Sequence, residues 1–143
     1  MNTQQIFDVA MMQGGLTINL TTNEIPTNGF AVSIPNKELQ VSYKYFSPEV
    51  LQNFINTNVA ALIKSNTFLG IWTNEGKVYL DLSIITNNLE EAILLGIEWN
   101  QKCVFDLANL QEIFLPAPQT NGTAAQRKTY ANMKSRELAQ MYK

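Results

Sequence analysis

The sequence predicts an α+β protein with a mainly antiparallel sheet, helices packed on one face, and a C-terminal basic helix or tail. Three observations lead to this prediction. Short segments with period-two hydrophobicity are separated by turns, helical spacing interrupts them at a few places, and no regular strand–helix–strand crossover repeats along the chain. We expect a single α+β domain over residues 1–115, then a linker and a basic helix or tail over residues 116–143.

The N-terminal third of the chain predicts one short helix followed by three strands. The helix covers residues 3–13, and Gly14-Gly15 follows it where the chain needs a left-handed conformation to stop. Its apolar residues at helical spacing are Ile6, Val9 and Ala10. Apolar and polar residues then alternate as in half-buried strands over residues 16–20, 29–34 and 39–46.

A longer helix is predicted to begin at Ser47-Pro48-Glu49. Serine accepts hydrogen bonds from free backbone amides, proline is tolerated at the first helical position, and an acid favours the positive helix end. The helical pattern runs to about Lys64. Its apolar residues are Leu51, Phe54, Ile55, Val59, Leu62 and Ile63.

A hairpin, a helix and two more strands complete the predicted domain. Two β-rich runs, residues 68–73 and 78–84, flank a four-residue Asn/Gly turn and predict the hairpin. Asn88-Leu89-Glu90-Glu91 gives a helix start that is similar to a capping box, with Asn in place of Ser or Thr. The apolar face of this helix consists of Leu89, Ala92, Ile93, Gly96 and Ile97. The last two strands are expected at residues 102–107 and 111–115.

The tail differs from the rest of the chain in charge. Residues 1–126 contain five lysines and eleven acids, a net charge of −6, whereas residues 127–143 contain five cations and one acid, a net charge of +4. Its apolar residues fall roughly on one helical stripe, Tyr130, Met133, Leu138 and Met141. Such a helix is marginal alone in water, so we expect it to pack on its own domain, on a second subunit or on another molecule.

The basic tail is the first candidate binding element. Its candidate residues are Arg127, Lys128, Tyr130, Lys134 and Arg136. They could contact phosphates or an acidic protein surface. In the structural alternative, the stripe packs on a sister subunit, or the +4 tail docks on the acidic body. The acidic body itself argues against broad nucleic-acid binding by the domain.

Two acids inside predicted strands are the second candidate. Alternation over residues 78–84 places Tyr79, Asp81 and Ser83 on one face. If Asp106 lies on a neighbouring strand, then Tyr79, Asp81 and Asp106 form a strand-face site that could perform acid/base chemistry or hold Mg²⁺. In the alternative, both acids lie on the solvent face or bond nearby backbone amides. The alternative is favoured because no third acid stands at metal-ligand spacing.

Several function classes lack their usual residues. The chain has no histidine, so the commonest general base and metal ligand is missing. Cys103 is its single cysteine, which excludes an intrachain disulfide and a thiolate zinc site. No phosphate-binding glycine motif is present. We therefore expect no enzyme, cofactor or metal, and without a signal peptide or a long apolar run we expect a soluble cytoplasmic protein away from membranes.

Three stretches of the chain form an ordered set of short motifs. They are Gly14–Thr17 with Glu24–Val32, Val78–Ser83 with Glu90–Ala92, and Asn100–Leu107. The set resembles small hypothetical proteins of bacteriophages and prophages that carry "GGxT…PTxGYxV", "VYLDVS…EEA" and "NQxAIFDL" elements in that order, and it covers roughly residues 14–115. The chain departs from the pattern at Phe30 and Cys103, where Tyr and Ala are usual. Because that family has no established activity, the resemblance implies a phage-type origin and no reaction.

The leading hypothesis is a non-enzymatic phage-type accessory protein that binds a host factor stoichiometrically in the host cytoplasm. The factor is a defence component or its nucleotide signal, and the protein is expected to be a homo-oligomer joined by sheet edges or by the C-terminal helix. Tail cations of a second subunit would then help to hold a nucleotide. One alternative is a virion or assembly protein that only self-associates. The other is a small hydrolase that uses Asp81 and Asp106.

Overall fold

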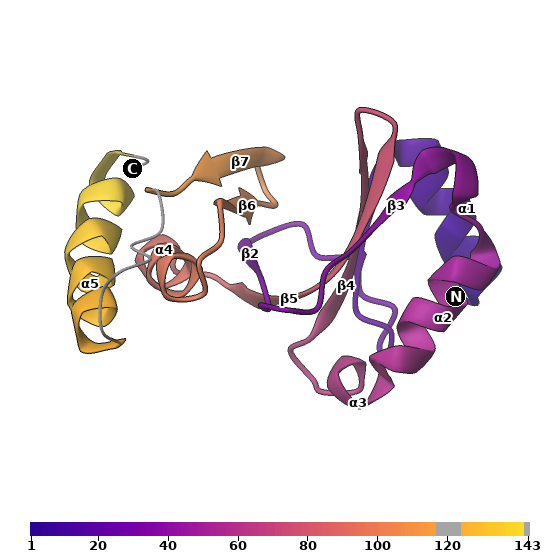
Figure 1. Cartoon of the computed structure of the whole chain (residues 1–143), viewed down its shortest axis with the longest axis horizontal. Helices are drawn as coiled ribbons and strands as arrows, with labels where there is room; N and C mark the ends of the chain where they lie inside the picture. Colours follow the sequence, from indigo (N-terminus) through magenta and orange to yellow (C-terminus); the bar gives the residue numbers. More distant parts are fainter. Residues whose placement is uncertain (117–123, 142–143) are drawn as a thin grey trace. The chain divides into compact units, whose positions relative to one another are not determined.

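The computed structural model describes residues 1–116 and 124–141, which fall into two compact units (Figure 1). The first unit consists of Met1–Pro26 and Asn36–Ser83, and the second of Thr27–Pro35 and Ile84–Lys143. The boundary expected at residue 115 does not coincide with the boundary between the units, and the C-terminal helix belongs to the second. The predicted α+β class is confirmed, and the described strand pairs are antiparallel.

The first unit is a four-stranded antiparallel sheet with helices. Its helices are α1 (Thr3–Gln13), α2 (Pro48–Thr57), α3 (Val59–Leu62) and the 3-10 helix η1 (Tyr43–Tyr45). Its strands are β1 (Gly15–Ile18), β3 (Leu39–Ser42), β4 (Phe68–Asn74) and most of β5 (Lys77–Thr86). The strands pair in the order β1-β4-β5-β3. Helix α1 packs against β1 and β4, and α2 lies beside α1 (Figure 1).

Local signals in the sequence set several ends of these elements as predicted. The side chain of Asn2 accepts from the backbone N–H of Gln5, the side chain of Gln5 accepts from the N–H of Asn2, and α1 begins there. Gly14, with φ of 82°, ends the helix. The β4–β5 hairpin is also confirmed. Its connection has two residues, Glu75 and Gly76, whose positive φ values of 51° and 78° suit the twist of the strands.

The prediction of one continuous helix from Pro48 to Lys64 is wrong, because the chain breaks at Asn58. There φ is −112° and ψ is 15°, and the Asn58 side chain donates to the carbonyl of Phe54 at 2.9 Å. The side-chain bond competes with helix continuation. The short α3 that follows points its side chains in new directions. Val59 and Ile63, expected on the apolar face, are therefore 52% and 66% exposed.

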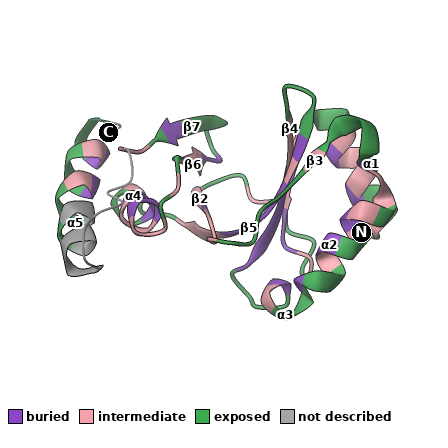
Figure 2. Ribbon diagram, viewed as in Figure 1, coloured by how far each residue is buried: buried purple, intermediate pink, exposed green. Residues whose placement is uncertain are grey.

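The predicted half-buried strand over residues 39–46 is also only partly present. β3 stops at Ser42, and residues Tyr43–Tyr45 form η1. Figure 2 shows β3 as largely exposed, and Leu39 and Tyr45 are 40% and 68% exposed. The reason is non-local: β3 pairs with β5 alone among the described strands, so its side chains have few neighbours. Alternation by itself does not reveal how much of a strand is covered.

The second unit is a three-layer arrangement of strands, α4 and α5. Its elements are β2 (Phe30–Ser33), the last residues of β5, α4 (Leu89–Glu98), β6 (Cys103–Asp106), β7 (Gln111–Phe114) and α5 (Ala124–Met141). β6 pairs with β2 and with β7. Val32, Val104 and Ile113 form a buried cluster with Ala92 of α4. Helix α5 packs on α4, so α4 lies between the strands and α5 (Figure 1).

We predict that the cap of α4 supports the second unit. The Asn88 side chain accepts from the backbone N–H of Glu91 at 2.9 Å, and Asn88→Ala would leave that amide without this acceptor. Thermal or urea unfolding should show a loss of about 1 kcal/mol. Asn88→Ser keeps an acceptor, so its free energy of unfolding should differ from that of the parent by only ~0.3 kcal/mol. Equal losses in the two variants would contradict the capping role.

Candidate functional site

One face of the first unit's sheet carries a row of side chains that crosses all four strands. Register pairs Gly15 with Trp72, Trp72 with Tyr79, and Tyr79 with Gln40. Residues directly opposite each other in paired strands share a face, so these four residues form a continuous line. We call Gly15, Trp72, Tyr79 and Gln40 the aromatic row. The predicted placement of Tyr79 on the face away from Leu80 is confirmed.

The aromatic row is ordered by contacts between its own members. The rings of Trp72 and Tyr79 have centroids 5.5 Å apart and are tilted by 42°. Gln40 donates from Nε2 to the Tyr79 hydroxyl at 3.0 Å. Gly15 has no side chain, and even a Cβ there would lie 3.3 Å from Cβ of Trp72. Trp72 and Tyr79 are half-buried and Gln40 is exposed, so the row offers ring surface and hydrogen-bonding groups to a planar ligand.

Asp81 lies on the same face, two residues along β5 from Tyr79, but it is 7% exposed. Register places Gly70 opposite Asp81, and a Cβ on Gly70 would overlap Asp81 Oδ1. The missing side chain of Gly70 therefore makes room for the carboxylate. Ser83 Oγ donates to Asp81 Oδ1 at 3.2 Å. The alternative that Asp81 faces solvent is wrong, because its carboxylate is packed into the sheet face.

Asp106, unlike Asp81, accepts hydrogen bonds from the turn that follows its own strand. Its Oδ1 accepts from the backbone N–H groups of Ala108 and Asn109 at 3.1 and 3.2 Å, and its Oδ2 accepts from Nδ2 of Asn109 at 2.8 Å. This is the predicted alternative in which an acid bonds nearby amides, and it closes the β6–β7 turn.

The expectation that Asp81 and Asp106 stand on neighbouring strands is wrong. Asp81 belongs to β5 in the first unit and Asp106 to β6 in the second. β6 pairs with β2 and β7 rather than with β5. Sequence alternation gives the face of a residue within its own strand but does not say which strands pair. The three residues predicted as one strand-face site are therefore divided between two units.

The basic tail packs on its own chain, one of the three outcomes expected from the sequence. In α5, Ser135 and Ala139 are buried, and Ala139 joins a cluster with Ile93 and Ile97 of α4. The predicted apolar stripe is mostly wrong, because Met133 and Met141 are 58% and 75% exposed while Leu138 is half-buried. Small side chains at positions 135 and 139 let the two helices approach closely, which a search for large apolar residues overlooks.

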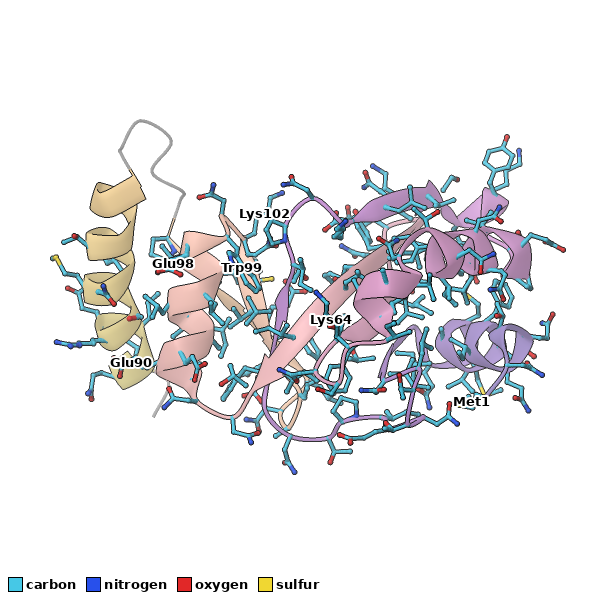
Figure 3. The ribbon with its side chains drawn as sticks, turned by 90° about the horizontal axis from the view of Figure 1, so that it is seen from below. Met1, Lys64, Glu90, Glu98, Trp99 and Lys102 are labelled. Atoms are coloured by element: carbon cyan, nitrogen blue, oxygen red, sulfur yellow. The ribbon has the colours of Figure 1, made fainter. Side chains whose placement is uncertain are left out.

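Two tail cations form ion pairs with acids of the chain. Lys134 Nζ lies 3.1 Å from Glu137 Oε2, and Arg136 Nε lies 3.6 Å from Glu90 Oε1. Glu90 stands on α4 beside α5 (Figure 3). These pairs are solvent-accessible and contribute little energy. The side chains of Arg127, Lys128 and Tyr130 lie outside the part of the chain that the structure describes.

The other buried polar groups of the described chain have hydrogen-bond partners. Cys103 is half-buried, and its Sγ lies 3.7 Å from Glu112 Oε2 across the β6–β7 pair. Within residues 1–116 and 124–141, no buried side-chain nitrogen or oxygen lacks a hydrogen-bond partner, and no three Asp, Glu or Cys side chains gather as metal ligands would. The buried polar groups of the described chain are thus accounted for within the fold.

Sequence reasoning missed Trp72 and Gln40. Alternation over residues 68–73 carries the signal that Trp72 lies on the face opposite to Ile71. Gln40 could not be found in this way, because its place depends on the pairing of β3 with β5, strands far apart in the sequence.

Comparison with known proteins gives this site no precedent. The chain matches no protein-family model, and it shows no significant similarity to a curated protein or to a solved structure. The likeness to phage and prophage proteins therefore remains a prediction that rests on the sequence motifs. No helix in the described part of the chain has both the length and the apolar character to span a membrane.

We predict that substitutions at Gly70 and Asp81 are coupled in their effect on stability, because a side chain at position 70 would occupy the volume that the Asp81 carboxylate fills. Gly70→Ala should lower the free energy of unfolding by about 1–3 kcal/mol, because the new methyl group displaces the carboxylate. Combined with Asp81→Ala, the loss should be smaller than the sum of the single losses by about 1 kcal/mol. Denaturant unfolding of all four chains measures this coupling.

Gly76→Ala serves as the control for this cycle. It forces alanine into a φ of 78° but meets no atom within 4 Å. Its cost should therefore simply add to that of Asp81→Ala. Additive losses in the Gly70 cycle would show that no steric coupling exists.

Proposed function

We propose that the protein is a non-enzymatic, phage-type accessory protein that binds a host factor stoichiometrically through the aromatic row. The observation that supports this proposal is the half-buried Trp72–Tyr79 pair with Gln40 bonded to the Tyr79 hydroxyl. Tryptophan and tyrosine supply large contact area at small conformational cost and are enriched among the residues that dominate binding energy. A row held in place before the partner arrives loses little entropy on binding.

The charges of this face favour a host protein over an anionic nucleotide. Exposed Lys77 and buried Asp81 lie on this face, each two residues from Tyr79 along β5, so its two nearby charges are opposite in sign. A nucleotide phosphate needs several convergent cations or N–H groups, and the four strands of this face carry a single lysine there. An arginine or aromatic side chain of a protein suits the row, because both stack on aromatic rings.

The roles of the two strand acids support binding rather than hydrolysis. A hydrolytic pair needs both carboxylates at one bond. Asp106 holds the β6–β7 turn with both of its oxygens, and Asp81 accepts from Ser83 over Gly70. Each acid therefore has a structural task of its own within its unit. The proposed protein works by occupying its partner and needs one copy for each partner it blocks.

We predict that Trp72→Ala removes capture of the host partner. The tagged chain would be incubated with bacterial host lysate, and the retained proteins and small molecules identified by mass spectrometry. Truncating the indole removes the largest ring of the row, so retention should fall at least tenfold, equivalent to about 1.4 kcal/mol. Tyr45→Ala is the matched control, because Tyr45 is an exposed aromatic of η1 outside the row. It should retain the partner fully.

Three results would contradict the proposal. The first is equal retention by the parent and by Trp72→Ala. The second is retention of a nucleotide instead of a protein, which would reverse the charge argument. The third is turnover of a substrate by the isolated chain.

A further inference from the structure

Among the described strands, β7 forms an edge of the second unit, whereas the aromatic row belongs to the first unit. β7 is the last strand in the described strand order and pairs there with β6 alone. Such an edge presents backbone N–H and C=O groups that can pair with another strand. β7 is exposed over most of its length (Figure 2). Phe114 is 64% exposed, and Leu110 just before the strand is 76% exposed.

The β6–β7 register shows which backbone groups point outward. Leu115 N donates to Lys102 O at 2.8 Å, and Val104 pairs with Ile113. Hydrogen-bonding residues alternate along an antiparallel strand, so Ile113 and Leu115 direct their backbone groups toward β6. Glu112 and Phe114 therefore direct theirs away from β6, at the free edge.

The usual protection of an edge strand is weak here. Natural edges are blocked by lysine or proline within the strand, by bulges or by a covering element. β3, an edge of the first unit, has Lys37, Glu38 and Lys44 close to its ends. β7 itself contains neither lysine nor proline, its one charged residue is Glu112, and Pro116 lies two residues beyond its end, outside the Glu112–Phe114 segment.

We propose that β7 pairs antiparallel with β7 of a second copy, centred on Ile113. Opposite residues must share a face, so a symmetric pairing within this strand is centred either on Glu112 or on Ile113. The first register sets two glutamates of like charge directly opposite each other, which is unfavourable. The second sets Glu112 opposite Phe114 of the second copy.

In the register centred on Ile113, the edge of β7 is complementary to the same edge of a second copy. Glu112 and Phe114 have the outward backbone groups, and each of the two Glu112–Phe114 pairs exchanges two main-chain hydrogen bonds. The same pairing lays the aliphatic stem of Glu112 along the exposed ring of Phe114. A second copy therefore gives hydrogen-bond partners to the outward backbone groups of Glu112 and Phe114. It also covers the exposed Phe114 ring and sets no like charges opposite each other.

Sedimentation over a range of concentrations tests the pairing. The parent chain should shift from monomer to dimer, whereas Phe114→Pro removes an outward N–H from each copy and should weaken association by roughly 30-fold. The bonds to β6 are made by neighbouring residues, so circular dichroism should show a folded variant. Ile63→Asn, which removes an exposed apolar side chain in the first unit, is the control and should dimerise like the parent.

Disulfide trapping tests the register without a proline. In a Cys103→Ser background, chains with Glu112→Cys should cross-link to chains with Phe114→Cys, because hydrogen-bonded partners have Cα atoms about 5.5 Å apart. Neither chain should cross-link efficiently to itself. A parent chain that stays monomeric, a folded Phe114→Pro dimer, or self-cross-linking of Glu112→Cys would each overturn the proposal. These readouts do not involve host lysate, so they stand apart from partner capture at the aromatic row.

Discussion

The alternation of β5, fixed by its pairing with β4, is the constraint on which the first unit depends. Leu80 and its neighbours at even spacing enter the core, so Tyr79 and Asp81 must face the other side. The two-residue turn at Glu75 and Gly76 fixes this register. A slip by one residue would bury the aromatic ring in the core and expose the leucines. The core and the aromatic row are therefore two consequences of the same pairing.

Elements with strong local signals could be predicted from the sequence, and those decided by distant contacts could not. The cap at Asn88, the stop at Gly14 and the β4–β5 hairpin each depend on a few adjacent residues. The break at Asn58 was hidden because the apolar spacing continues beyond it. The packing of α5 was also hidden, since Ala139 is buried while larger apolar residues nearby are exposed. Burial on α4, rather than helix propensity, decides which residues of α5 matter.

The candidate site shows the same division between local and distant information. Tyr79 and Asp81 were placed correctly on one face, because alternation acts within one strand. The role of Asp106 was set by its own turn. Trp72 and Gln40 join the row only through pairing between strands, and pairing across long loops is not encoded in any short segment. The prediction from single strands therefore included Tyr79 but missed Trp72 and Gln40, which lie beside it on the paired strands.

In the function that we propose, the protein holds a partner on a preformed aromatic face, and the accessibility of one indole tests this directly. The chain has two tryptophans, so in Trp99→Phe the fluorescence comes from Trp72 alone. Quenching by acrylamide would be compared in the free chain and in its complex with the captured host protein. We expect the half-buried indole to be quenched in the free chain and protected in the complex. Equal quenching in both states would contradict it.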